Sequence, residues 1–123
     1  MSGKVLVVED NVASRELLVE ILGSLKCEIR AASDGAAALE ILRTFRPDVI
    51  LMDIQLPLMD GVSVLQTIRR NPELQGVRIL AVTAYAMQGD RERFLEQGFD
   101  GYLCKPIDVA TLLNEVKKVL DAA

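Results

Sequence analysis

Residues 48–61 have the sequence DVILMDIQLPLMDG, and this segment decides the fold class. Within it, Val49 to Met52 form an unbroken apolar run that ends in a carboxylate, Asp53. A short run that is apolar on both faces is typical of a central strand in a parallel sheet, which helices cover on both sides. The proline, aspartate and glycine that follow predict a loop, so Asp53 is expected where the strand leaves the sheet. Ligands of open α/β sheets bind at that edge.

Taken alone, Asp53 has two interpretations. An aspartate after a strand commonly caps the next helix or hydrogen-bonds within a loop, because its short side chain suits both positions. The alternative is a reactive or metal-binding group. Residues elsewhere in the chain decide between these two roles.

Composition limits the possible functions. The length of 123 residues corresponds to one domain, and a net charge of −4 argues against non-specific attachment to nucleic acid or anionic lipid. The chain has no histidine, which excludes Ser-His-Asp and Cys-His nucleophiles, histidine-ligated zinc and a phosphohistidine carrier. Its two cysteines, Cys27 and Cys104, cannot build a four-ligand metal site and are expected to be reduced, small apolar residues.

The N-terminal segment predicts the compartment. Only four apolar residues, Val5 to Val8, follow Lys4, too few for a signal peptide or a membrane span. We therefore expect a cytoplasmic protein that contacts neither membrane nor nucleic acid directly. The start at Met1 and the clean C-terminal end favour a stand-alone protein, with residues 1–123 as its single domain.

Strand-like and helix-like segments alternate along the whole chain. Short β-branched and apolar runs predict strands, and apolar residues at three- and four-residue steps predict helices. Strands are expected at residues 4–8, 27–32, 48–53, 77–83 and 99–104. Helices are expected at about residues 12–25, along the stripe 38–45, around 64–68, over 91–97, and from a cap at Asp108 to about three residues before the C-terminus. This alternation predicts an α/β fold: a doubly wound, five-stranded parallel sheet of order 2-1-3-4-5, flavodoxin-like (βα)5.

Polar residues directly follow four of the five predicted strands. They are Glu9 and Asp10 after the first strand, Asp53 after the third, Thr83 at the end of the fourth and Lys105 after the fifth. In the predicted order these four strands are neighbours, so the side chains converge on one crevice. No structural requirement accounts for three carboxylates, a hydroxyl and an ammonium at one edge, which favours the functional role for Asp53.

The chemistry of such a cluster is specific. Three carboxylates within a few ångströms repel one another, so some become protonated unless cations neutralise them. Oxygen ligands without histidine or cysteine suit a hard ion, Mg²⁺ in particular, which keeps places for water and phosphate oxygens. Phosphoryl transfer needs mainly positioning and charge stabilisation, and a carboxylate can accept the phosphoryl group. Asp53, flanked by the other groups, is the natural acceptor.

These motifs, in this order and spacing, resemble the receiver domain of two-component response regulators over the whole chain. The stretches that carry the resemblance are VVEDN at residues 7–11, MDIQLP at 52–57 with Asp60-Gly61, VTA at 82–84, and Lys105-Pro106. The stretches 52–57 and 81–87 are most similar to stand-alone regulators of the DivK type and to receivers of hybrid histidine kinases. The resemblance implies a phosphorylatable signalling switch, and we do not expect an enzyme.

The resemblance also implies roles in phosphorylation. Asp53 would accept the phosphoryl group from a sensor histidine kinase or a phosphotransfer protein. Glu9 and Asp10 would hold Mg²⁺ together with Asp53, and the backbone carbonyl of Gln55 would complete the protein ligands. Asp60 more plausibly serves the loop geometry than the metal.

Further roles concern the response to phosphorylation. Lys105 would pair with the phosphoryl group, and Thr83 would hydrogen-bond to it. Tyr102 matches the switch aromatic of the family, and the Lys105–Pro106 peptide is usually cis there. A downstream protein would read the surface formed by the fourth helix, the fifth strand and the fifth helix.

Three other functions share parts of this pattern. A Mg²⁺-dependent phosphatase of the haloacid dehalogenase type also uses an aspartate after a parallel strand, but it requires a second aspartate where this chain has Gln55. A flavodoxin-like flavin binder requires a phosphate loop rich in serine, threonine and glycine where this chain has Glu9-Asp10-Asn11. An excised receiver of a hybrid kinase would have the same motifs as a stand-alone regulator.

Overall fold

The computed structural model of the protein describes residues 3–56, 60–84 and 90–122. Strands and helices alternate along these residues as the sequence predicts. In order, the elements are β1 (Lys4–Val8), α1 (Val12–Leu22), the 3₁₀ turn η1 (Gly23–Leu25), β2 (Glu28–Ala32), α2 (Gly35–Ile41), β3 (Val49–Asp53), α3 (Gly61–Arg69), the 3₁₀ turn η2 (Pro72–Leu74), β4 (Arg78–Thr83), α4 (Asp90–Gln97), β5 (Gly101–Cys104) and α5 (Val109–Ala122).

The five strands form one parallel sheet in the order β2-β1-β3-β4-β5, which confirms the predicted fold class. Every residue of the central strand β3 is buried, because helices lie against both of its faces. The register aligns Val8 of β1 with Met52 of β3, and Asp53 with Val82 of β4. The carboxyl ends of these strands are therefore level, and the residues that follow them emerge together.

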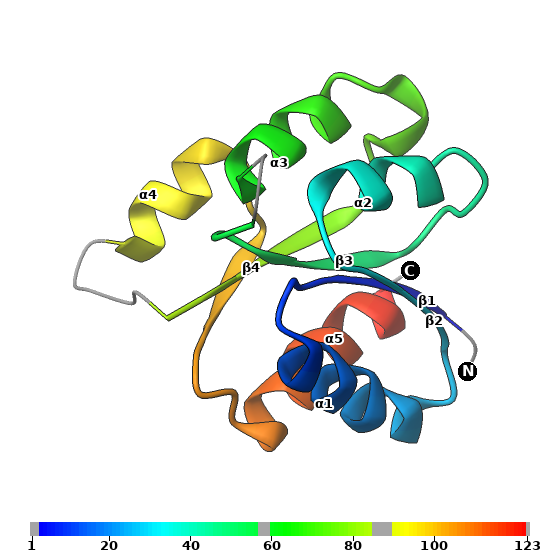
Figure 1. Ribbon diagram of the computed structural model, residues 1–123, viewed down its shortest axis with the longest axis vertical. Coiled ribbons are helices and arrows are strands. Elements are labelled where there is room, and N and C mark those ends of the chain that lie inside the picture. Colours follow the sequence, from blue (N-terminus) through cyan, green and yellow to red (C-terminus); the bar gives the residue numbers. More distant parts are fainter. Residues whose placement is uncertain (1–2, 57–59, 85–89, 123) are drawn as a thin grey trace.

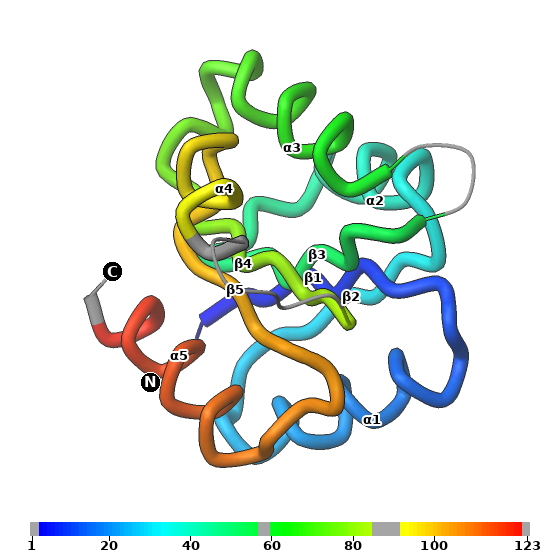
Figure 2. The backbone as a smooth tube through the Cα atoms, turned by 90° about the vertical axis from the view of Figure 1, so that its left-hand side faces the viewer, coloured from blue at the N-terminus to red at the C-terminus, as the bar shows by residue number. Residues whose placement is uncertain are grey.

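Two helical layers sandwich the sheet, as Figures 1 and 2 show. Helices α2, α3 and α4 cover one face, and α1 and α5 cover the other. Alternate residues of β3 supply the two cores: Ile50 and Met52 join the first, and Val49 and Leu51 join the second. No helix in the described parts of the chain is long and apolar enough to cross a membrane.

Helices α1 and α2 end earlier than predicted. The α-helical part of α1 stops at Leu22, and its expected last turn is the 3₁₀ turn η1, which ends at Lys26 in a left-handed conformation. Helix α2 stops at Ile41 rather than near Phe45. Beyond it, the Arg43 and Thr44 amides bond to carbonyls three residues back, and the Arg46 guanidinium donates to the Leu42 carbonyl. Leu42 and Phe45 are nevertheless buried, as their spacing predicted.

The predicted fifth strand is too long at its start. Gly98 has φ of +114°, which turns the chain, and the Phe99 amide bonds back to the Phe94 carbonyl. Phe99 is therefore a core residue of a turn, and β5 begins at Gly101. Helix α5 runs to Ala122, somewhat further than expected. Residues 57–59 of the predicted loop lie outside the described residues.

Candidate functional site

Asp53 is the last residue of β3 and has only 5% of its surface exposed. Its Oδ1 accepts a hydrogen bond of 3.0 Å from the Gln55 amide. The Ile54 amide donates to the carbonyl of Val82 on the adjacent strand β4, which fixes the backbone next to Asp53. The sheet thus holds this carboxylate at its carboxyl edge with little freedom to move.

Glu9 and Asp10 follow β1 and differ in their surroundings. Glu9 is 1% exposed, its amide donates to Ala32 of β2, and its Oε2 accepts from the Asn11 amide at 3.2 Å. Asp10 is exposed. One carboxylate oxygen each from Glu9, Asp10 and Asp53 lies within 4.8 Å of the other two. The structure therefore brings together the three acids that the sequence placed at this edge.

Lys105 enters the cluster from the end of β5. Its Nζ lies 2.6 Å from Glu9 Oε1 and 3.5 Å from Asp53 Oδ2. The Lys105 amide donates to the Thr83 carbonyl, which fixes the backbone position of the lysine. The peptide bond to the exposed Pro106 is cis, as the resemblance implied. The ammonium offsets part of the negative charge but is outnumbered by three carboxylates.

This imbalance of charge determines how the site titrates. Burial, followed by hydrogen bonding and repulsion from Glu9, raises the pKa of Asp53 to about 7, although the Gln55 amide and Lys105 act in the opposite direction. Burial acts to raise the pKa of Glu9 too, but hydrogen bonds with Asp53, Lys105 and Asn11 outweigh it and lower that pKa. Burial acts to lower the pKa of Lys105, and the two carboxylates reverse this and raise it. Of the two buried carboxylates, Asp53 is therefore the one that binds a proton more readily.

The donor set fits a small, hard divalent cation. All candidate ligands are oxygens, and their spacing and net negative charge suit Mg²⁺ better than a softer metal. Because burial and Glu9 raise the pKa of Asp53, a cation that compensates the charge of this carboxylate would be favourable there. Gln55 is exposed, next to the opening of the site.

Thr83 and Tyr102 lie on the neighbouring strands β4 and β5. Thr83 ends β4 and is 2% exposed. In the parallel pairing of β4 with β5, Tyr102 is opposite Ala81 and Cys104 is opposite Thr83. Thr83 and Tyr102 therefore share one face of the sheet as diagonal neighbours. Tyr102 is partly buried there against the core under α2, α3 and α4.

Three nearby residues have roles that the sequence interpretation missed. Asn11 caps α1 through the Ser14 amide while its own amide holds Glu9, and an asparagine before a helical stripe could have signalled this cap. Arg15 donates to the Glu9 carbonyl at 3.0 Å, a contact that no sequence pattern indicates. A Cβ at Gly61 would lie 2.5 Å from the carbonyl oxygen of Asp53, so α3 approaches the site as closely as only glycine allows.

Asp60 caps α3, since its Oδ1 accepts from the Ser63 amide at 2.8 Å. It is not among the acids that lie within ligand distance of one another in the described part of the chain. This agrees with the expectation that Asp60 serves the loop rather than the metal. Cys104, expected to be a packing residue, is an exposed free thiol in β5, and Cys27 is a partly buried one.

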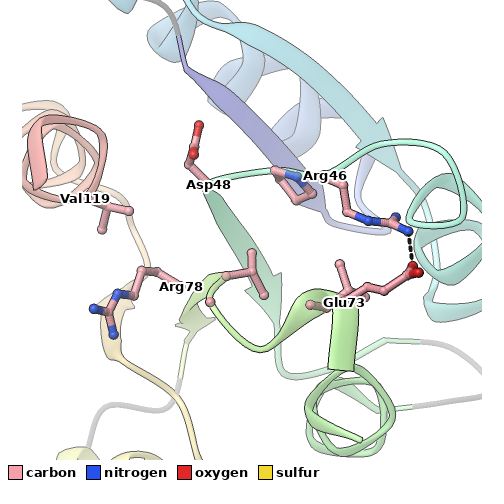
Figure 3. Close-up of a pocket in the computed structure, with 9 residues that line it drawn as sticks. Arg46, Asp48, Glu73, Arg78 and Val119 are labelled. Atoms are coloured by element: carbon pink, nitrogen blue, oxygen red, sulfur yellow. Dashed lines mark hydrogen bonds and ion pairs between the residues drawn. The ribbon is translucent and has the colours of Figure 1, made fainter. Parts of the chain in front are cut away.

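A groove at the opposite edge of the sheet is a poorer candidate. About 370 Å³ of open space there is lined by Arg46, Asp48, Glu73, Arg78 and Val119, among others (Figure 3). Its charges are already matched: Arg46 pairs with Glu73 at 2.5 Å, and Arg78 pairs with Asp100 at 3.4 Å. The groove lacks the excess of one charge that makes the carboxyl edge reactive.

Comparisons with known proteins show the family of the chain. The family model of the response regulator receiver domain matches residues 5–117. The polar-differentiation response regulators DivK of Brucella anthropi and Brucella ovis are each 37% identical over 123 residues, with both chains fully covered.

Two solved structures illustrate the similarity. The receiver domain of sensor histidine kinase PA1611 from Pseudomonas aeruginosa, which has a magnesium ion coordinated in its active site cleft, is 36% identical with a TM-score of 0.88 over 98% of this chain and 99% of that one. The chemotaxis response regulator CheY4 of Vibrio cholerae is 28% identical with a TM-score of 0.89 over 97% and 99% of the two chains. Both the family model and the full-length relatives lead to one conclusion: the chain belongs to the response regulator receiver domain family and is a phosphorylatable regulator of two-component signalling.

Proposed function

We propose that Asp53 accepts the phosphoryl group, that Glu9, Asp10, Asp53 and the carbonyl of Gln55 hold Mg²⁺, and that Lys105 and Thr83 bind the transferred group. The observation that carries this proposal is the meeting of three carboxylates and one ammonium around the end of β3. Bound there, Mg²⁺ would supply positive charge that stabilises the transferring phosphoryl group.

The transfer makes one bond and breaks one. A carboxylate oxygen of Asp53 attacks the phosphorus atom, an acyl phosphate bond forms, and the bond from phosphorus to the donor's nitrogen breaks as that nitrogen takes up a proton. Asp53 must be deprotonated to attack, and the Lys105 ammonium at 3.5 Å favours the charged form. Burial of Asp53 and its fixed backbone restrict the carboxylate to the geometry of the site.

A direct test compares three proteins incubated with acetyl phosphate and Mg²⁺. Intact mass measurement should detect one added phosphoryl group on the wild type, and hydroxylamine should remove it. Asp53→Asn should gain none, whereas Asp60→Asn, altered at the neighbouring cap of α3, should still be labelled. A hydroxylamine-sensitive phosphoryl group on Asp53→Asn would contradict the assignment.

The phosphodonor protein is proposed to dock beside the opening of the site on α1. A groove of about 190 Å³ there is lined by Glu9 and Lys105 on one side and by Leu17, Leu18 and Ile107 on another. Leu17 is 50% exposed, and so is available to an apolar partner surface that would also exclude water from the reacting groups.

Comparing phosphorylation by a donor protein with phosphorylation by acetyl phosphate distinguishes the docking step from the chemical step. Leu17→Glu should slow phosphorylation by a cognate histidine kinase or phosphotransfer protein and leave labelling by acetyl phosphate unchanged. Leu95→Glu alters a comparably exposed leucine on α4 and serves as the matched control. Equal rates for both variants with the protein donor would remove α1 from the docking surface.

The output surface is proposed to be α4, β5 and α5, which a downstream protein would read when Tyr102 repacks. Tyr102 links these elements to the site, since it lies on β5 and its ring centroid is 6.0 Å from that of Phe94 on α4. We further propose that the chain works in the cytoplasm as a single receiver domain. Its role would be that of a switch rather than a turnover enzyme.

A further inference from the structure

Arg69, the last residue of α3, bonds to three acceptors in two separate segments. Its Nη1 donates to the Val77 carbonyl at 2.7 Å, just before β4. Its Nη2 donates to the Gly98 carbonyl at 3.2 Å and pairs with Asp100 Oδ2 at 2.8 Å, both in the turn between α4 and β5. The Arg69 and Asp100 side chains are each 27% exposed, so this is a partly buried, multiply hydrogen-bonded pair rather than a solvated surface pair. We call Arg69, Val77, Gly98 and Asp100 the Arg69 clamp.

Asp100 extends the clamp into the sheet. Its Oδ2 also accepts from the Ile79 amide at 2.8 Å, and its own amide donates to the Ile79 carbonyl at 2.8 Å. Arg78 pairs with its Oδ1 at 3.4 Å. The carboxyl end of α4 is thus fastened to α3 and to the start of β4 through both main-chain and side-chain bonds.

The rest of α4 is held much less firmly. Among residues 92–97, Phe94 alone is buried, and the other five are exposed. Phe94 packs edge-on against Phe99, with ring centroids 5.9 Å apart, and it also contacts Tyr102. In Figures 1 and 2, α4 lies at one end of its helical layer, next to α3 and β5. A helix that is fastened at one end, and that buries a single side chain over residues 92–97, can change its direction without leaving the fold.

We infer that Arg69 is a positioning residue that fixes the carboxyl end of α4 as a pivot, so that repacking of Tyr102 moves Phe94 and swings the amino end of the helix. This inference rests on the proposed function, because it takes Tyr102 as the group that responds to phosphorylation. It assigns the fixed point to the Arg69 clamp and the moving contact to Phe94. A clamp that served stability alone would not determine which end of α4 moves.

The pivot can first be tested in the unphosphorylated protein by native-state amide exchange. Arg69→Met keeps most of the aliphatic stem and removes the guanidinium bonds, so the Gly98 and Asp100 amides should exchange about tenfold faster. The Leu51 amide in the middle of β3 reports global unfolding and corrects for any general loss of stability. Arg70→Met is the matched control, because Arg70 is the exposed neighbour at the end of the same helix and its side chain makes no hydrogen bond or ion pair within the described part of the chain. Unchanged Gly98 and Asp100 exchange, after that correction, would overturn the clamp.

The second test measures which end of α4 moves. The protein for this test has its two native cysteines replaced by serine. One spin label is placed at Gln66 on α3 and the second at residue 92 or residue 97, so that the two distances report the positions of the two ends of α4. With beryllofluoride and Mg²⁺ as the phosphoryl mimic, the distance from residue 92 should change by about 2 Å and the distance from residue 97 should not. In Arg69→Met both distances should change, whereas Arg70→Met should behave as the wild type.

The outcomes of the two tests are distinct. Equal movement of both ends in the wild type, no movement of either, or a wild-type response in Arg69→Met would each overturn the pivot. Amide shifts at Gln55 and Thr83 report whether the mimic binds at Asp53. If those shifts are absent in the wild type, the proposed function fails, and the exchange measurement still decides whether Arg69 fastens the end of α4.

Discussion

The ammonium of Lys105 lies 2.6 Å from a carboxylate oxygen of Glu9, closer than the 3.5 Å that separates it from Asp53. The lysine therefore neutralises mainly the buried glutamate in this structure. Burial removes hydration from Asp53, and its hydrogen bond with and repulsion from Glu9 remain, so its pKa is raised while that of Glu9 is lowered. Of the two buried carboxylates, the proposed acceptor is the one whose charge the protein compensates less.

Asp53→Asn should stabilise the metal-free protein at pH 8 by about 1–3 kcal/mol, with a smaller gain at pH 5. The pKa of Asp53 is about 7 in the folded protein against an ordinary 3.8, so the folded state binds more protons than the unfolded state between these values. Stability of the wild type therefore falls as pH rises through this window, and the uncharged asparagine removes that loss. The lowered pKa of Glu9 and the raised pKa of Lys105 act outside pH 5–8.

Urea unfolding in EDTA at pH 5 and pH 8 measures this effect. The same titrations in Mg²⁺ provide the control, because a bound cation would compensate the charge of Asp53 and reduce the advantage of asparagine. A gain that is equal at both pH values without metal would rule out a raised pKa as its origin.

Asp10→Ala should weaken Mg²⁺ binding by about 10- to 100-fold without destabilising the fold. Asp10 is exposed, lies within ligand distance of Glu9 and Asp53, and makes no hydrogen bond or ion pair in the described structure, so its loss removes a ligand and relieves repulsion. Asp60→Ala is the opposite case: loss of the α3 cap should cost about 1 kcal/mol of stability and leave Mg²⁺ affinity unchanged. Calorimetric titration with Mg²⁺ separates the two, and equal affinities for wild type and Asp10→Ala would contradict the metal site.

Gly61→Ala should destabilise the protein by about 1–3 kcal/mol, although alanine is the better helix former. The new Cβ would lie 2.5 Å from the Asp53 carbonyl oxygen and 3.0 Å from Ile54 Cα, so either α3 or the backbone beside the acceptor must shift. Gly76→Ala is the control, since nothing lies within 4 Å of a Cβ there and the effect should be near zero or slightly stabilising. Thermal unfolding of both variants checks the difference, and equal melting temperatures would show that the contact relaxes without cost.

The sequence was sufficient for the sheet order and for the meeting of Asp53, Glu9 and Lys105, because each follows an apolar run directly. Strand ends in a parallel sheet lie at one edge, so this placement needs no knowledge of packing. The same pattern could not show that Lys105 favours Glu9 over Asp53, since that depends on side-chain reach across two strands. Nor could it show the Arg69–Asp100 pair. Its partners are 31 residues apart in the sequence, and the turn at Gly98 directly precedes the segment that carries Asp100.

Helix α2 shows a limit of periodicity. Leu42 and Phe45 continue the apolar stripe and are buried as predicted, yet the helix ends at Ile41. For apolar residues to be buried, the backbone only has to remain packed against the sheet. A turn with hydrogen bonds three residues back meets this requirement as well as a further turn of α-helix does. The Arg46 side chain, bonded to the Leu42 carbonyl, satisfies an acceptor that the helix leaves unpaired.

Thr83→Ala should still accept a phosphoryl group but respond to it poorly. Thr83 ends β4, one position beyond Val82, the partner of Asp53 across the sheet, so phosphoryl oxygens on Asp53 would offer its hydroxyl a charge-assisted hydrogen bond. An inward shift of Thr83 would open space on the face that it shares with Tyr102, and the tyrosine could then repack against the core.

Amide spectra of wild type and Thr83→Ala, each with and without beryllofluoride and Mg²⁺, measure this coupling. Both proteins should show shifts at Gln55, which reports binding at Asp53, but only the wild type should show the full shifts at Tyr102 and along α4. Thr83→Ser restores the hydroxyl without the methyl group and should recover most of the response. Wild-type shifts around Tyr102 in Thr83→Ala would mean that the response reaches Tyr102 by a route other than this hydroxyl. The hydrogen bond from the Ile54 amide to the Val82 carbonyl is one such connection.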